Sequence, residues 1–128
     1  MEHQTLDKLN TIFHMRDVFM KEMRNHIPKA QPDLPINLGN KEGQQYCRDL
    51  ALRGVEEMFE ALQHLKNWKT HRLTEMTEFN RDEFLEEVVD AFNYFYALLI
   101  AVDCDVDEFF DAFCRKDKII HDRVTNKY

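Results

Sequence analysis

Four acidic residues form two pairs in which the second acid follows the first by three positions: Glu57 with Glu60, and Glu87 with Asp90. Residues three apart lie on the same face of a helix, so each pair would place two carboxylates side by side. Like charges held together repel each other unless a cation neutralises them. If a helical bundle brings the two pairs face to face, their carboxylates form a divalent-metal site.

The donor types favour Mg²⁺, with Mn²⁺ as a possible substitute. Mg²⁺ prefers carboxylate and phosphate oxygens in octahedral geometry, so it suits acidic pairs that bind a phosphorylated substrate. A di-iron centre is disfavoured because such bundles use Glu-x-x-His pairs, and none of the six histidines lies three residues after a Glu. A single Glu-x-x-Glu pair is more commonly a solvated helix face. A non-catalytic helical binding module, in which the acids form only structural ion pairs, therefore remains an alternative.

The composition predicts one all-α domain over residues 1–128, built as a four- to five-helix bundle. A chain of 128 residues is about the size of one domain. It has only three Gly and three Pro, and all the prolines lie between positions 28 and 35, so most of the chain lacks helix breakers. Apolar periodicity predicts helices over Leu6–Asn25, Glu42–Lys66, Arg81–Val102 and Asp105–Val124.

Charge, cysteines and hydropathy limit the partners and the compartment. The net charge of −7 argues against a nucleic-acid surface, although a small phosphorylated ligand could still bind a local metal or basic cluster. The three cysteines are widely separated and contain no C-x-x-C pair, which indicates reduced, packed thiols. No apolar run is long enough to span a bilayer, and no signal peptide is evident. We expect a cytoplasmic protein with neither a nucleic-acid nor a membrane partner.

Three local features bear on the site. Thr5 and Asn80 are suited to cap the first and third helices. The third helix is apolar over so wide an arc that we expect it to be the most buried, which would also bury Glu87 and Asp90. The proline-containing connection before the second helix is long, so Asn37 either helps to cover a ligand or belongs to a plain linker.

Beyond these features, the sequence resembles the all-α nucleoside triphosphate pyrophosphohydrolases, the superfamily that contains MazG-type enzymes and dimeric dUTPases. The order Glu56-Glu57-x-x-Glu60, a gap of 26 residues and Glu87-x-x-Asp90 matches their acidic motif. Residues 65–69 (LKNWK) are similar to the Lys and Trp motif of phage and bacterial dimeric dUTPases, and residues 34–39 (LPINLG) to the loop between their first two helices. Near the C-terminus, Phe113, Lys116, Arg123 and Tyr128 have the spacing of the aromatic, Lys, Arg and Tyr residues in the last helix of that family.

The resemblance implies Mg²⁺-dependent hydrolysis of a nucleoside triphosphate between the α and β phosphates, giving the monophosphate and pyrophosphate. It implies that the two acidic pairs hold two or more Mg²⁺ ions and that Glu60, or next Glu57, accepts a proton from the attacking water. Further residues are implied in substrate binding: Lys66, Lys69, Lys116 and Arg123 near phosphate oxygens, Trp68 against the base or a neighbouring subunit, and Asn93 at the nucleotide.

Base recognition is where the sequence departs from dimeric dUTPases. Their first helix offers a Gln to the pyrimidine, whereas the equivalent stretch here is His14-Met15-Arg16. An Arg only donates hydrogen bonds, so Arg16 would suit an acceptor-rich edge such as that of guanine or cytosine. We expect dUTP as the leading substrate, with a MazG-like preference for dCTP or dGTP as the alternative. A short chain with aromatic surface to cover also predicts a homodimer or a dimer of dimers.

Overall fold

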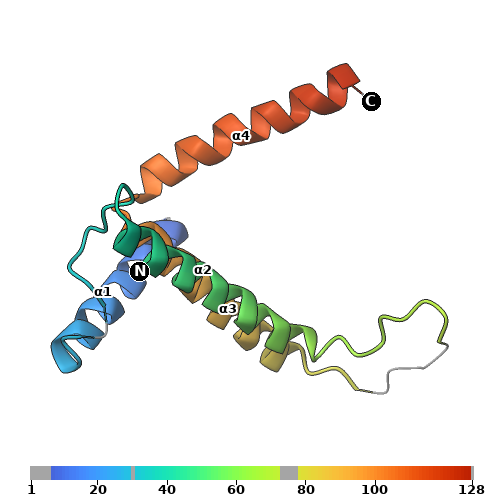
Figure 1. Ribbon diagram of the computed structural model, residues 1–128. Helices are drawn as coiled ribbons and strands as arrows, with labels where there is room; N and C mark the ends of the chain where they lie inside the picture. The colour runs from blue at the N-terminus through green and yellow to red at the C-terminus, as the bar shows by residue number, and fades with distance from the viewer. Residues whose placement is uncertain (1–6, 30, 73–77, 128) are drawn as a thin grey trace, which may run out of the picture. The chain divides into compact units, whose positions relative to one another are not determined.

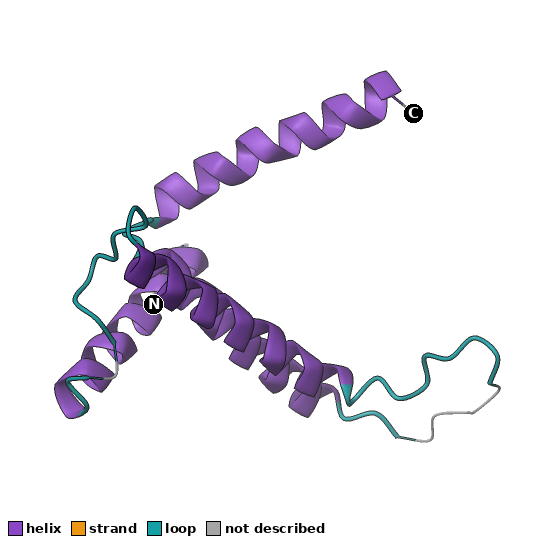
Figure 2. Cartoon of the chain, in the orientation of Figure 1, coloured by secondary structure: helices purple, strands orange, loops and turns teal. Residues whose placement is uncertain are grey.

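The computed structural model describes residues 7–29, 31–72 and 78–127, and every regular element within them is an α-helix (Figure 2). The helices are α1 (Lys8–His26), α2 (Lys41–Leu62), α3 (Arg81–Ala101) and α4 (Val106–Lys127) (Figure 1). The predicted all-α class is confirmed. Among the described helices, none combines the length and the apolar character needed to cross a bilayer.

The chain divides into two compact units. The first joins Met1–Pro35 with Leu99–Tyr128, and the second is Ile36–Leu98. The first unit therefore contains α1, α4 and the last turn of α3. The second contains α2, the rest of α3 and the connection between them.

In the second unit, α2 and α3 pack side by side through small residues (Figure 1). Gly54 and Ala61 of α2 and Ala91 and Ala97 of α3 are all buried. A Cβ placed on Gly54 would lie only 2.4 Å from Cε1 of Phe95, so the ring of Phe95 occupies the space that a side chain would need. This close approach positions the acids of α2 opposite those of α3.

The first unit is organised around two buried residues of α1, Phe13 and Met20. The ring of Phe13 lies 6.3 Å from the ring of Phe109, near the start of α4. The side-chain amide of Gln31 donates to the carbonyl of Met20 at 3.1 Å and ties the following segment to α1. This small apolar core anchors the N-terminal end of α4.

Each helix begins at a side chain that accepts a backbone N–H three residues on. The predicted cap at Asn80 is confirmed, because its Oδ1 accepts the N–H of Glu83 at 3.0 Å. Thr5 lies outside the described residues, and Asp7 caps α1 by accepting the N–H of Asn10 at 3.1 Å. Two further caps act on α2 and α4: Asn40 on the N–H of Gly43 at 2.7 Å, and Asp105 on that of Glu108 at 2.8 Å.

The second helix ends earlier than predicted, at Leu62 rather than Lys66. The N–H groups of Gln63, His64 and Leu65 donate to carbonyls three residues back, a tighter pattern than the α-helical one. Because the helix closes with these tight turns, Lys66 lies in the connection to α3. The periodicity of apolar residues continues past this point, and it therefore predicts too long a helix.

A tight turn joins α3 to α4. Asp103 has a φ of 61°, in the left-handed region. The N–H of Cys104 donates to the carbonyl of Leu99 at 2.9 Å, and that of Asp103 to Ile100 at 3.0 Å. This pair of bonds is a Schellman ending, which satisfies the last carbonyls of α3. Asp105 then begins α4 immediately.

Candidate functional site

Three of the four predicted acids come together between α2 and α3. Glu57 from α2, and Glu87 and Asp90 from α3, each offer a carboxylate oxygen that lies within 4.8 Å of the other two. Glu57 and Glu87 are half-buried, and Asp90 is exposed. The three-residue spacing places Glu87 and Asp90 one turn apart on α3, and the close packing of α2 brings Glu57 to them.

The geometry and donor types of this acidic cluster fit a hard divalent cation. Mg²⁺ binds oxygens at 2.0–2.1 Å, so octahedral ligands lie about 3.0 Å apart when adjacent and about 4.2 Å apart when opposite. The three carboxylate oxygens lie within 4.8 Å of one another, which is near the larger of these two separations. The cluster contains carboxylates alone, without the imidazole or thiolate ligands that favour zinc or iron.

Mutual repulsion and burial act together on Glu57. The pKa of its carboxyl is raised above its ordinary value of 4.5, first by burial and then by the charge of Glu60, the charge of Asp90, a hydrogen bond with Glu60 and the charge of Glu87. All four predicted acids therefore belong to one electrostatic cluster. A bound cation would relieve the repulsion that raises this pKa.

Glu60 differs from the other three acids. It is exposed and lies outside the group of three oxygens, although it interacts with Glu57. Its carboxylate is therefore more open to solvent than that of Glu57 or Glu87. The adjacent acids of the doublets, Glu56 and Glu86, are also exposed, as predicted for Glu86.

The expected burial of the acids on α3 is only partly met. Glu87 is half-buried, but Asp90 is exposed, and so are the neighbouring Val89 and Phe92. The sequence suggested otherwise because α3 is apolar over a wide arc, yet within the second unit one side of this helix is not covered. Within this unit the carboxylate of Asp90 is therefore accessible to solvent.

A cationic and aromatic hollow begins at the C-terminal end of α2. It has a volume of about 720 Å³. Three predicted substrate residues line it, Lys66, Trp68 and Lys69, and the Nζ of Lys69 lies 5.5 Å from the centroid of the Trp68 ring. The side chain of Trp68 is 71% exposed, so its ring is available to a ligand.

Arg72 lines the same hollow and was not predicted. The sequence feature that could have identified Arg72 is its place in a series of cations three residues apart, Lys66, Lys69 and Arg72. Such a series stands out in a chain whose net charge is −7. Phe59, which immediately precedes Glu60, lines the hollow as well. The hollow therefore starts at the same turn of α2 that carries the acidic cluster.

The two candidate asparagines of this unit have different surroundings. The Oδ1 of Asn37 accepts the N–H of Gly39 at 2.8 Å, and its backbone carbonyl accepts the N–H of Asn40 at 3.4 Å. Asn37 therefore shapes the turn that leads into α2. Asn93 is half-buried on α3, one turn beyond Asp90.

The remaining candidates, Arg16, Lys116 and Arg123, belong to the first unit. Arg16 is half-buried, and its guanidinium carbon lies 4.6 Å from the centroid of the Phe19 ring. Lys116 and Arg123 are exposed on α4. Tyr128 lies outside the described residues.

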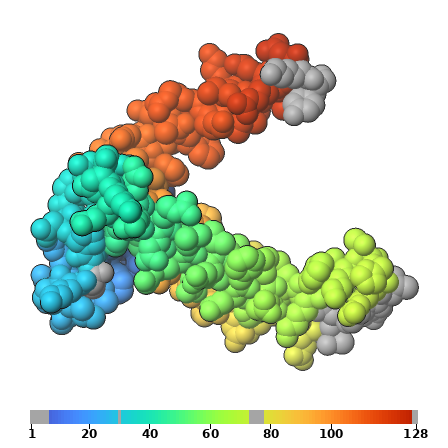
Figure 3. All heavy atoms as spheres, viewed as in Figure 1, coloured from blue at the N-terminus to red at the C-terminus, as the bar shows by residue number. Residues whose placement is uncertain are grey.

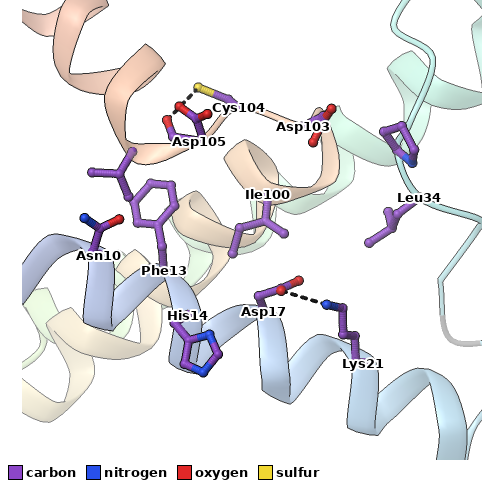
Figure 4. A pocket seen from close by; sticks show the side chains of 12 residues that line it. Asn10, Phe13, His14, Asp17, Lys21, Leu34, Ile100, Asp103, Cys104 and Asp105 are labelled. Carbon is purple, nitrogen blue, oxygen red and sulfur yellow. Dashed lines mark hydrogen bonds and ion pairs between the residues drawn. The ribbon is translucent and has the colours of Figure 1, made fainter.

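A second hollow, of about 510 Å³, lies within the first unit (Figure 4). Asp17 and Lys21 on its wall form an ion pair at 3.0 Å. Burial, followed by the charges of Glu108 and Asp105, raises the pKa of the Cys104 thiol on the same wall. This environment keeps the thiol protonated, so it is a poor nucleophile.

The described residues thus bring together an all-oxygen acidic cluster on α2 and α3, and a cationic, aromatic hollow at the end of α2. No family model, no curated protein and no solved structure matches the chain.

Proposed function

We propose that this protein is a Mg²⁺-dependent pyrophosphohydrolase of nucleoside triphosphates, with dUTP as its leading substrate. The observation that carries the proposal is the meeting of Glu57, Glu87 and Asp90 within 4.8 Å. The resemblance of the acidic motif and of residues 65–69 to the all-α nucleoside triphosphate pyrophosphohydrolases supports it. The reaction cleaves the bond between the α and β phosphates.

In this proposal each acid has a defined task. Glu57, Glu87 and Asp90 hold Mg²⁺, and Glu60 completes the set when more than one ion binds. The bound ion supplies charge neutralisation of the triphosphate and acidification of the attacking water. Glu60 accepts the proton that water loses as its oxygen bonds to the α phosphorus, and the bridging oxygen leaves with pyrophosphate.

The hollow beyond α2 supplies the groups that a triphosphate needs. Lys66, Lys69 and Arg72 donate to phosphate oxygens, where charge shifts during cleavage. Trp68 offers an exposed aromatic face for the base.

Further substrate contacts come from Asn37, Asn93, Arg16, Lys116 and Arg123. We assign base selection to Arg16, with dCTP or dGTP as the alternative substrates. We further propose that the enzyme works as a homo-oligomer in the cytoplasm, where Cys47, Cys104 and Cys114, which form no disulfide, would stay reduced.

The experiment that tests the proposal measures pyrophosphate and monophosphate release from a panel of deoxy- and ribonucleoside triphosphates. Each reaction is run with Mg²⁺, with Mn²⁺ and with EDTA. We expect equal amounts of the two products, with turnover abolished by EDTA. Release of inorganic phosphate instead would indicate a different bond and contradict the proposal.

Matched variants locate the chemistry. Glu60→Gln should abolish turnover, whereas Glu42→Gln, which changes an exposed acid of the same helix outside the motif, should leave it intact. Circular dichroism confirms that both variants keep the helical fold. Retained turnover in Glu60→Gln would refute its assignment as the base.

Absence of turnover with every substrate would favour a non-catalytic binding module. In that case Mg²⁺ with a non-hydrolysable triphosphate should leave the melting temperature unchanged if the acids form only structural contacts. If Mg²⁺ with the non-hydrolysable triphosphate raises the melting temperature but no substrate is turned over, the protein has the binding site and the proposed catalysis is refuted.

A further inference from the structure

The hollow of the first unit shares no residue with the proposed hydrolytic site, and its walls have a different chemistry (Figure 4). All of its lining residues belong to the first unit. Its volume of about 510 Å³ lies within the range of small-molecule sites in proteins. The hollow is therefore large enough for a small organic ligand.

The helix α1 and the turn between α3 and α4 form two facing walls of the hollow (Figure 4). The second wall consists of Ile100 at the end of α3, the turn at positions 103–105 and Val106 at the start of α4. The contact between the rings of Phe13 and Phe109 holds the two walls together. The residues of α1 recur at helical spacing and so share one face: Asn10, Phe13, His14, Asp17 and Lys21.

The segment that follows α1 forms a third side of the hollow through Leu34. Figure 3 shows the atoms of this segment beside those of α1. Two contacts keep the segment there. The side-chain amide of Gln31 donates to the carbonyl of Met20 at 3.1 Å, and Arg24 forms an ion pair with Asp33. Leu34 is thereby held beside α1 as an apolar side of the hollow.

The lining of the hollow is negatively charged. It carries three carboxylates, those of Asp17, Asp103 and Asp105, and a single ammonium, that of Lys21. With His14 neutral, one positive and three negative charges give the lining a net charge of −2. Such a lining repels a triphosphate and attracts a cation. The hollow is therefore unsuited to a second molecule of the proposed substrate.

The three carboxylates of the hollow do not converge on one point. Among the described residues, only the acidic cluster on α2 and α3 brings three ligand atoms of acids, histidines or cysteines within 4.8 Å of one another. Asp17, Asp103 and Asp105 therefore do not surround a single metal ion. Figure 4 shows Asp17 on α1 and Asp103 on the facing turn, with Ile100 between them. The negative charges are thus separated by apolar surface.

We propose that this hollow binds a linear aliphatic diamine in its doubly protonated form. One ammonium group pairs with Asp17, and the other pairs with the carboxylates of Asp103 and Asp105 on the facing turn. The methylene chain between them lies against the apolar side chains of Leu34 and Ile100. This inference concerns the first unit alone and does not depend on the proposed hydrolysis.

The ion pair between Asp17 and Lys21 leaves room for a competing ammonium group. The two side chains are 33% and 70% exposed, respectively, and their Oδ2 and Nζ atoms lie 3.0 Å apart. Exposed ion pairs of this kind are weak. The ammonium group of a ligand that also makes apolar contacts can therefore displace Lys21 from Asp17.

Isothermal titration calorimetry with a series of linear diamines, from diaminopropane to diaminooctane, tests the proposal. The titrations are run with EDTA at neutral pH, where both amino groups are protonated, and in about 0.15 M NaCl, which screens diffuse attraction to the acidic chain. We expect one site per chain. The best diamine should bind at least tenfold more tightly than the monoamine of the same chain length, because the monoamine leaves one end of the hollow unpaired.

Two pairs of charge-matched variants locate the ligand. Asp17→Asn should raise the dissociation constant at least fivefold, whereas Glu22→Gln, an exposed acid of the same helix outside the hollow, should leave it within twofold. Lys21→Gln should lower the dissociation constant, because it removes the competing ammonium group. Lys8→Gln changes the net charge equally but lies outside the hollow, so it should have little effect. Circular dichroism checks that each variant keeps its helices.

Several results would overturn the proposal. The absence of binding by every diamine would refute the site, and equal affinity for diamines and monoamines would refute the two-ended arrangement. Equal losses in Asp17→Asn and Glu22→Gln would show diffuse attraction to an acidic chain. A larger loss in Asp90→Asn than in Asp17→Asn would place the diamine at the acidic cluster instead. None of these measurements involves turnover, so the diamine site and the proposed hydrolysis fail separately.

Discussion

Replacing Gly54 by Ala tests whether the close packing of α2 on α3 is what forms the site. The added Cβ would lie 2.4 Å from Cε1, 2.8 Å from Cζ and 2.9 Å from Cδ1 of the Phe95 ring. Ordinary contacts between carbon atoms lie at 3.5–4.0 Å, so the ring or the helix must move by about 1 Å. Overpacking of this kind costs about 1–3 kcal/mol, while Ala in place of Gly in a helix stabilises by up to about 1 kcal/mol.

The steric term outweighs the helix propensity, and we expect a net loss of about 1–2 kcal/mol in the free energy of unfolding. For a chain of this size that corresponds to a fall in melting temperature of roughly 3–10 °C. Gly54 lies one turn before Glu57, so moving α2 also separates the carboxylates. The rise in melting temperature on adding Mg²⁺ should therefore shrink in Gly54→Ala.

The measurement is thermal unfolding with EDTA and with Mg²⁺, followed by circular dichroism. Gln45→Ala, at an exposed position on the same helix, is the control and should change stability by less than about 0.5 kcal/mol. Phe95→Leu combined with Gly54→Ala should cost less than the sum of the single changes, because the smaller side chain leaves room for the methyl group. A Gly54→Ala protein as stable as the original would refute the packing argument.

Further predictions concern the site and the caps. Asp90→Asn should abolish the Mg²⁺-dependent rise in melting temperature, whereas Glu86→Gln should keep it; a full rise in Asp90→Asn would exclude this acid as a ligand. In the metal-free protein, the fold binds the Glu57 proton more tightly than the unfolded chain does, so stability should fall as pH rises from 4.5 through the raised pKa. Glu57→Gln should remove that part of the dependence of the free energy of unfolding on pH, as measured by urea unfolding at several pH values. An unchanged pH dependence would contradict the pKa argument. Trp68 is the only Trp, so binding of a non-hydrolysable triphosphate should change its fluorescence, and a constant signal at saturation would place the base elsewhere. Asn80→Ala should lower the free energy of unfolding by about 1 kcal/mol through loss of the cap on α3, which urea titration would detect.

Local patterns in the sequence predict the helices well because helix formation depends on near neighbours. The spacing of apolar residues and the rarity of Gly and Pro predict four helices, and the third is predicted to begin at Arg81, as observed. The cap at Asn80 follows from residue type alone. The end of α2 is not predictable in this way, since the apolar period continues past Leu62 while the backbone closes with tighter turns.

The candidate site was partly predictable for the same reason. Spacing puts Glu87 beside Asp90, and Glu57 beside Glu60, within each helix. Which acids meet across the two helices depends on the packing of Phe95 against Gly54, a contact between residues 41 positions apart. Only the tertiary structure shows that Glu57 joins Glu87 and Asp90 while Glu60 remains outside the group.

The sequence by itself determined the helical class, the start of α3 and the pairing of acids along each helix, because these depend on interactions within one or two turns. The tertiary structure decided the three-acid cluster, the exposure of Asp90 and the place of Arg72 in the cationic hollow. These features depend on how closely separate segments approach, which the sizes of side chains distant in the sequence control.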